Sequence, residues 1–155
     1  MLTADIVITA DCWGAEPGAE DIVQRAIVSA ASVAPGQGDG AELAVMLTDD
    51  AGIRALNHDW RGIDKATNVL SFPAIALPEG GGQPRALGDI AIAYETTCRE
   101  AEAENKPFGH HLSHLAVHGF LHLIGYDHVT DDDAETMEQL ERDILARLGI
   151  PDPYA

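Results

Sequence analysis

Four short stretches of the chain are rich in aliphatic and β-branched residues and have the length of strands. They are ADIVITA at 4–10, AELAVMLT at 41–48, TNVLSFP at 67–73 and LGDIAIA at 87–93. Pro73 is expected to end the third. The pattern predicts four β-strands, all in the first part of the chain.

Five other segments repeat apolar residues every three or four positions, which is the spacing of one helix face. They span approximately residues 22–33, 50–57, 94–105, 109–124 and 134–148. Pro35 and a glycine cluster should stop the first helix, and Asp49 and Asp50 should cap the second. Residues 57–65 mix charged, aromatic and glycine residues as surface loops do. Residues 74–86 show no periodicity, and we expect a flexible connection that could cover a cleft.

Short strands followed by a helical second half predict an α+β domain. We expect a small mixed sheet of about four strands packed with helices. Its 155 residues, 46% hydrophobic, are enough for a single domain with a real core, so residues 1–155 are expected to form one unit.

Three histidines fall within HGFLHLIGYDH at 118–128. His118 and His122 are four apart, so a helix places them on one face, where they can hold one cation. Gly125 can end that helix in the left-handed conformation and turn His128 toward the same cation. Three nitrogen ligands with an open position are typical of catalytic zinc, whereas structural zinc sites usually have four protein ligands. The motif predicts one zinc ion per chain, on a central helix in the C-terminal half, and hydrolytic chemistry.

Two other accounts of this motif stay open. The spacing HxxxHxxGxxH is also that of metzincin proteases, but their general base is a glutamate after the first histidine, and here that residue is Gly119. Alternatively, the histidines pack in a histidine-rich helix without any metal.

Polar residues near the motif could support the ligands. His114 lies one turn before His118, and Asp127 could orient an imidazole, as carboxylates behind metal ligands do. Asp89 follows a glycine at a strand, where a structural role is slightly favoured over one near the metal. The histidines expected to be solvated are His58, His110 and His111.

Charge disfavours one class of function. Nine basic and 26 acidic residues give a net charge of −17, which opposes generic attraction to nucleic acid. Much of the acid lies in 100–104 and 131–141, where we expect exposed helix faces. Arg61 and Lys65 could still line a locally positive cleft beside a metal.

Cys12 and Cys98 lie far apart and form no CxxC pair, which suits a reducing compartment. No apolar run has the length of a membrane span, and no basic residue precedes the first apolar run. We expect a cytoplasmic protein without a membrane partner.

Arg61 is the candidate phosphate ligand. A guanidinium offers a rigid fork of donors that matches phosphate oxygens, so beside a metal it can hold a scissile phosphate and stabilise developing charge. The alternative is a surface ion pair with Asp59 or Asp64, which the residues alone would favour.

HGFLHLIGYDH, NHDWRGIDKATNVLSFP at 57–73, LGDI at 87–90 and the terminal GIPDPY together resemble the YbeY family of endoribonucleases. The resemblance agrees with a layered α/β fold. It implies a zinc-dependent, single-strand-specific endoribonuclease that acts in rRNA maturation, including the 3′ end of the small-subunit RNA, and in ribosome quality control. It makes Arg61 the residue important for activity. Further candidates for substrate binding or ligand support are Lys65, Asn68, Ser71, His114 and Asp127.

The nucleophile stays open between a zinc-activated water and the ribose 2′-hydroxyl. Because the chain is acidic, we expect the RNA to be presented by a ribosomal partner with a basic surface. The alternatives are a metallopeptidase and a non-enzymatic ribosome assembly factor whose zinc is structural.

Overall fold

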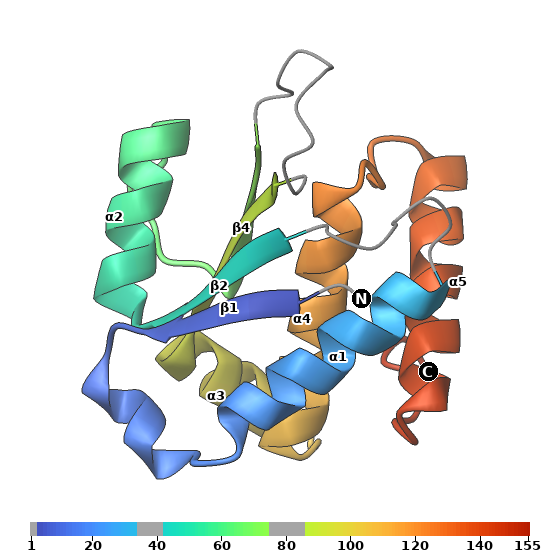
Figure 1. Cartoon of the computed structure of the whole chain (residues 1–155), viewed down its shortest axis with the longest axis horizontal. Coiled ribbons are helices and arrows are strands. Elements are labelled where there is room, and N and C mark those ends of the chain that lie inside the picture. Colours follow the sequence, from blue (N-terminus) through green and yellow to red (C-terminus); the bar gives the residue numbers. More distant parts are fainter. Residues whose placement is uncertain (1–2, 34–41, 75–85) are drawn as a thin grey trace.

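The computed structural model describes residues 3–33, 42–74 and 86–155 (Figure 1). The strands are β1 (Thr3–Ile8), β2 (Glu42–Thr48), β3 (Val69–Pro73) and β4 (Ala86–Ala93). The helices are α1 (Ala19–Val33), α2 (Asp50–Arg61), α3 (Tyr94–Ala103), α4 (Phe108–Leu123) and α5 (Asp131–Arg147), with a short 3-10 helix at Asp11–Ala15. The α+β prediction is confirmed. The predicted stop at Pro35 and nearly all of the connection at 74–86 lie outside the described residues.

The four strands form one mixed sheet in the order β1-β2-β4-β3. β1 pairs with β2 and β2 with β4 in parallel, whereas β3 pairs with β4 in the antiparallel direction. β3 therefore lies at an edge of the sheet, and one of its sides is free to border a cleft.

Alternate residues of β4 divide the molecule into layers. Ile90 and Ile92 belong to the large core that α1, α4 and α5 share with the sheet. Ala91 and Ala93 point to the other face, where they pack with Ile53 of α2. Figure 1 shows α2 on one side of the sheet and α1, α4 and α5 on the other.

Helix α4 is the central helix of the larger layer, as its apolar residues predict. It packs against β3, β4, α1, α3 and α5. Its buried residues include Leu112, Leu115, Phe120 and Leu121. Because neighbours surround this helix, its C-terminal end has a defined place beside β3 and β4.

Helix α2 is longer than the sequence predicts. It continues beyond Asn57 to Arg61, so the prediction of a loop from residue 57 was wrong for this last turn. Gly62 ends the helix at φ 71°, and its N–H donates to the carbonyl of His58 at 3.0 Å. Inside the helix, Asn57 is buried and its amide donates to the carbonyl of Lys65 at 2.9 Å. Arg61 is therefore held at the end of a helix rather than on a loop.

Within the described ranges, no helix combines the length and the apolar content that crossing a membrane requires.

Candidate metal centre

Three imidazoles meet at the C-terminal end of α4. His118 and His122 extend from its last two turns, and their Nε2 atoms lie 3.0 Å apart. One nitrogen from each of these rings and one from His128 lie within 4.8 Å of one another. Zinc–nitrogen bonds of about 2.1 Å in a tetrahedral site keep ligand nitrogens about 3.4 Å apart. The three side chains thus fit a single metal ion that keeps a further position open.

Gly125 places the third histidine. Its φ is 103°, a conformation that side-chain-bearing residues rarely adopt. Its N–H donates to the carbonyl of His122 at 3.1 Å, and the N–H of Tyr126 donates to that of Leu121 at 3.0 Å. This pair of bonds is a Schellman motif, which ends α4 and turns the chain back toward it. The sequence prediction of a glycine hinge is confirmed.

The environment of His122 favours the neutral imidazole. Burial lowers its pKa, and the nearby His118 and His128 lower it further, while the Tyr126 backbone and Asp127 oppose the change. A neutral imidazole has the lone pair that a metal ligand needs, so the site does not require a costly deprotonation.

Gly119 lies where α4 packs directly against β3 and β4. A Cβ placed there would lie 3.0 Å from Cγ2 of Ile90 and 3.3 Å from both Cγ2 of Val69 and Oγ of Ser71. Helix α4 therefore touches the sheet at the position where a metzincin carries its glutamate. A side chain at this position would crowd β3 and β4, and the base that a glutamate supplies in a metzincin is missing here.

An open cleft of about 620 Å³ connects the histidines with Arg61. Its wall contains all three histidines, the β3 segment at 69–71 with Pro73, and the turn at 125–128. The surface ion pair considered for Arg61 is not formed. Asp64 binds Arg54 with two contacts of 2.7 and 3.0 Å, and Asp59 lies 3.3 Å from His58. Within the described part of the chain, neither carboxylate pairs with Arg61, so its guanidinium is available to the cleft.

The comparisons with known proteins identify the family. The family model described as "Endoribonuclease YbeY" matches residues 15–149. The chain belongs to the YbeY family of endoribonucleases. The family's activity is the cleavage of RNA, and the resemblance noted in the sequence is confirmed.

Curated YbeY relatives match almost the whole chain. "Endoribonuclease YbeY" of Bradyrhizobium diazoefficiens is 66% identical and the match covers 97% of this chain and 84% of the relative. That of Rhodopseudomonas palustris strain CGA009 is 67% identical, with 97% and 80% covered. The solution structure of TM1509 from Thermotoga maritima has a TM-score of 0.54 at 21% identity, covering 94% of this chain and 91% of that one. It supports the fold.

Three of the further YbeY-segment candidates occupy different surroundings. Ser71 lines the cleft, and its hydroxyl donates to the carbonyl of Gly119 at 2.8 Å. Lys65 is exposed and is not part of the cleft wall. The amide of Asn68 donates to Glu100 at 2.9 Å and its oxygen accepts from the N–H of Val69. The structure therefore gives Asn68 a role in holding the start of β3.

Asp127 contacts the backbone of His128, one of the three candidate ligands. Its Oδ1 accepts from the N–H of His128 at 2.6 Å, instead of orienting an imidazole as the sequence suggested. Asp89 lies on the α2 face of the sheet beside Phe72, away from the histidines. His58 is exposed as expected, but His111 is 4% exposed and its Nε2 lies 2.8 Å from Glu100. The prediction that His111 is solvated was wrong, because α3 covers it with a carboxylate.

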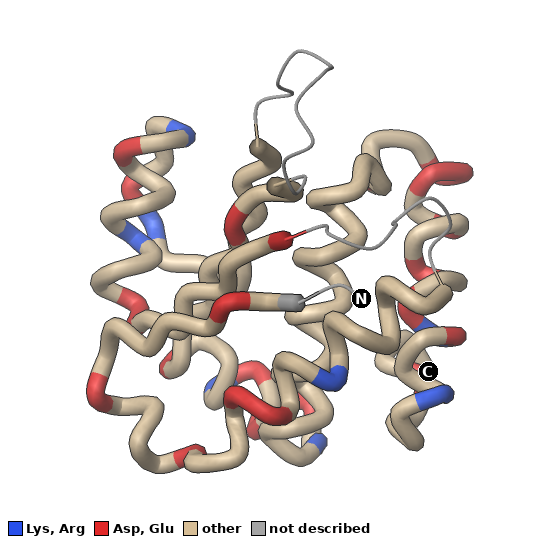
Figure 2. The backbone as a smooth tube through the Cα atoms, in the orientation of Figure 1, with Lys and Arg blue, Asp and Glu red and all other residues tan. Residues whose placement is uncertain are grey.

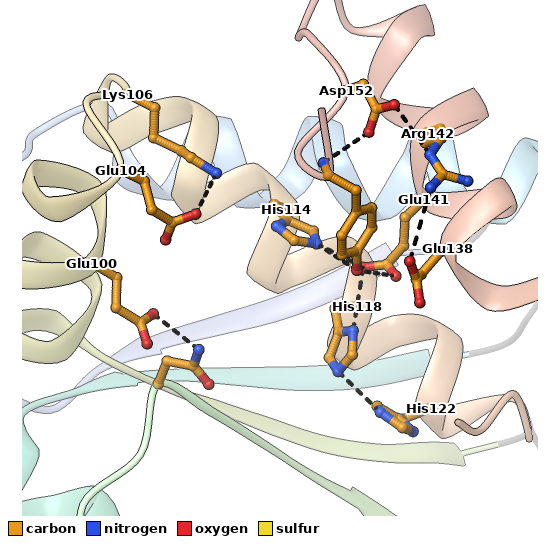
Figure 3. Close-up of polar contacts among 12 residues, drawn as sticks. Glu100, Glu104, Lys106, His114, His118, His122, Glu138, Glu141, Arg142 and Asp152 are labelled. Carbon is orange, nitrogen blue, oxygen red and sulfur yellow. Dashed lines mark hydrogen bonds and ion pairs between the residues drawn. The ribbon is translucent and has the colours of Figure 1, made fainter. Parts of the chain in front are cut away.

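Sequence reasoning missed Glu141 of α5 and Tyr154. The Glu141 carboxylate lies 2.7 Å from Nε2 of His114 and 3.2 Å from Nδ1 of His118, as Figure 3 shows. The hydroxyl of Tyr154 donates to it at 2.9 Å. The sequence does hint that Glu141 is buried, because it lies four positions after the apolar Met137 and therefore on the same helix face. An acid on an amphipathic helix is, however, usually exposed.

Proposed function

We propose that this protein is a zinc-dependent endoribonuclease that cuts ribosomal RNA. The observation that carries the proposal is the meeting of three imidazole nitrogens within 4.8 Å in the wall of a cleft that Arg61 also lines. Family membership supplies the RNA substrate, because the curated relatives are named endoribonucleases.

Different residues would bind the metal ion and the RNA phosphate. His118, His122 and His128 would hold the ion. When bound, zinc with an open position polarises a phosphoryl oxygen and lowers the pKa of a coordinated water. Arg61 would bind the scissile phosphate and stabilise charge that develops on its oxygens. Asp127 fixes the backbone of His128 through its accepted hydrogen bond.

The finer parts of the proposal concern the biological substrate. We propose single-stranded rRNA as the target, including the 3′ end of the small-subunit RNA, with a further role in ribosome quality control. Ribosome assembly takes place in the bacterial cytoplasm, so the protein would act there. A net charge of −17 favours a route in which a ribosomal partner with a basic surface presents the RNA. Faster cleavage of assembled than of naked RNA supports this route, and equal rates contradict it.

Metal content is the first test of the site. Elemental analysis of the native protein should give one equivalent of zinc, and His122→Ala should lose it. His110→Ala is the matched control, because His110 lies on the same helix but outside the cleft wall. Zinc retained by His122→Ala, or absent from native protein purified without chelators, contradicts the ligand assignment.

Arg61→Ala tests the phosphate ligand. Removing a positioned donor from developing charge costs about 10²–10³-fold in rate, so cleavage of single-stranded RNA should fall by that order while zinc content stays the same. Arg54→Ala is the matched control, since Arg54 is an exposed arginine of the same helix that binds Asp64 outside the cleft.

The control should cleave at the native rate. Equal loss in both variants would show that the effect comes from helix α2 and not from the phosphate. Unchanged cleavage by Arg61→Ala, with zinc bound, would favour the assembly-factor alternative or another phosphate ligand. A casein digestion assay with the native protein tests the peptidase alternative, for which we expect no activity.

A further inference from the structure

The last residues of the chain return to the metal-binding helix. The Tyr154 hydroxyl lies 2.9 and 3.1 Å from the two carboxylate oxygens of Glu141. The tail is fixed in this position by Asp152, which accepts from the N–H of Tyr154 at 2.8 Å and pairs with Arg142 at 3.1 Å. The Arg142 guanidinium also lies over the Tyr154 ring, 5.4 Å from its centre. Figure 3 shows Arg142 and Asp152 beside this contact.

Glu141 occupies a place that a helix normally gives to an apolar residue. It is 1% exposed and belongs to the inner face of α5, with Met137, Ile144 and Leu145. Burying a carboxylate is costly unless hydrogen bonds and charge compensate it. Nitrogens of His114 and His118 lie 2.7 and 3.2 Å from this carboxylate, and the Tyr154 hydroxyl donates to it at 2.9 Å. The group is therefore a buried carboxylate whose partners are imidazoles and a phenol.

The contact with His118 has a direction. A carboxylate can only accept, so the Nδ1 atom that lies 3.2 Å from Glu141 carries the hydrogen. This leaves the lone pair on Nε2, the atom that lies 3.0 Å from Nε2 of His122. Figure 3 shows Glu141, His118 and His122 in this succession. The carboxylate thereby selects the tautomer of His118 that points its free nitrogen at the metal position.

We propose that Glu141, clamped by Tyr154 of the C-terminal tail, is the positioning residue of the metal site. It fixes the tautomer and the ring orientation of His118, and His114 and Tyr154 fix the carboxylate in turn. This inference rests on the metal site of the proposed function. The metal site would then include, besides the three histidines, Glu141 of α5 and Tyr154.

Zinc affinity separates this role from a merely structural one. Replacing a carboxylate behind a ligand typically weakens metal binding by about 10–100-fold, so Glu141→Gln should raise the zinc dissociation constant by that factor in a chelator competition. Tyr154→Phe, which only releases the clamp, should weaken binding less. Glu135→Gln is the matched control, because Glu135 is an exposed carboxylate of the same helix. It should bind zinc as the native protein does.

A second readout excludes a general loss of stability. The visible spectrum of the cobalt-substituted protein reports ligand geometry, and we expect it to change in Glu141→Gln and Tyr154→Phe but not in Glu135→Gln. Ile144→Val truncates a buried neighbour on the same face and shows how far lower stability alone changes the affinity.

Each outcome separates the inference from the proposed function. A native protein that binds no zinc overturns the metal site itself. A native protein that binds zinc, with Glu141→Gln and Tyr154→Phe equal to it in affinity and spectrum, overturns only the positioning role. If Glu141→Gln does not fold, Tyr154→Phe decides, because the phenol lies in the tail and not in the large core.

Discussion

Gly119 of α4 packs so closely against the sheet that even a methyl group would crowd its neighbours. Replacing it with alanine adds a methyl group that meets Ile90 at 3.0 Å and Val69 and Ser71 at 3.3 Å. Overpacking of this kind costs about 1–3 kcal/mol, whereas the better helix propensity of alanine returns about 1 kcal/mol. Because Ile90 and Val69 belong to the sheet and cannot move freely, we expect Gly119→Ala to lower the free energy of unfolding by about 1 kcal/mol, measured by urea titration.

Gly109→Ala on the same helix is the control. There the added methyl group meets only Cδ1 of Ile22 at 3.2 Å, the movable end of a flexible side chain. Equal or greater stability is expected. Destabilisation of both variants to the same degree would show that packing against the sheet is not what restricts residue 119.

Single residues also show what the sequence can and cannot reveal about the site. His118, His122 and His128 are predictable because their spacing follows from helix geometry and one glycine. His111 is not, because its burial depends on Glu100, a residue of another helix. Glu141 likewise depends on the contact between α4 and α5, and only its place among apolar neighbours marks it in the sequence.

At the scale of elements, the two acids predicted to cap α2 cap different helices. Asp49 accepts from the N–H of Gly52 at 2.8 Å and caps α2 as predicted. Asp50 instead accepts from the N–H of Thr96, in the first turn of α3, at 3.1 Å. In return, Glu95 of α3 accepts from the N–H of Asp50 at 2.8 Å. Adjacent acids before a helix are recognisable as caps, but the helix that each one caps depends on tertiary structure.

Asp50 makes the start of α3 sensitive to acid. Burial acts to raise its pKa, but hydrogen bonds from Arg99 and Thr96 outweigh this and hold it below the ordinary 3.8. A carboxyl with a lowered folded pKa stabilises the fold above its ordinary pKa, and that stability is lost as the pH falls through the lower value. At neutral pH, Asp50→Asn should therefore cost about 1 kcal/mol, and the difference from native should vanish in acid.

Chemical denaturation from neutral pH to below 3.8 measures this difference. Asp21→Asn is the control, because Asp21 pairs with Arg25 on the exposed surface of α1, where ion pairs contribute little. A difference for Asp50→Asn that stays constant with pH would show that the cap acts without its charge.

At the scale of the whole molecule, the site depends on the order of the strands. The pattern of apolar residues predicts four strands, but it does not show that β3 reverses direction and takes the edge position. That position lets Arg61 of α2 line one cleft with His118 and His122 of α4, which packs on the opposite face of the sheet, and with His128 of the turn after α4. The cluster of three histidines was predictable from local sequence, whereas the shared cleft follows only from the assembled sheet.

Acidic residues outnumber basic ones in this chain, which works against binding of naked RNA. Figure 2 shows acids spread over most elements and clustered along α5, with few basic residues between them. Among the described residues of the cleft wall, Arg61 is the one lysine or arginine. Each phosphate that a protein neutralises on a single strand contributes about −0.7 to the slope of log affinity against log salt. Binding of naked single-stranded RNA should thus be weak, with a slope near −0.7 to −1.4 for one or two phosphate contacts.

Arg61→Ala should bring this slope closer to zero by about 0.7, whereas Arg54→Ala should leave it unchanged. Fluorescence anisotropy with a labelled oligonucleotide at several salt concentrations measures it in the zinc-loaded protein. A much steeper native slope would mean that several basic residues engage the backbone, and the acidic chain would then need no partner to present its RNA. A shallow slope that depends on Arg61 leaves most of the binding energy to contacts outside this chain, as presentation by a basic ribosomal surface requires.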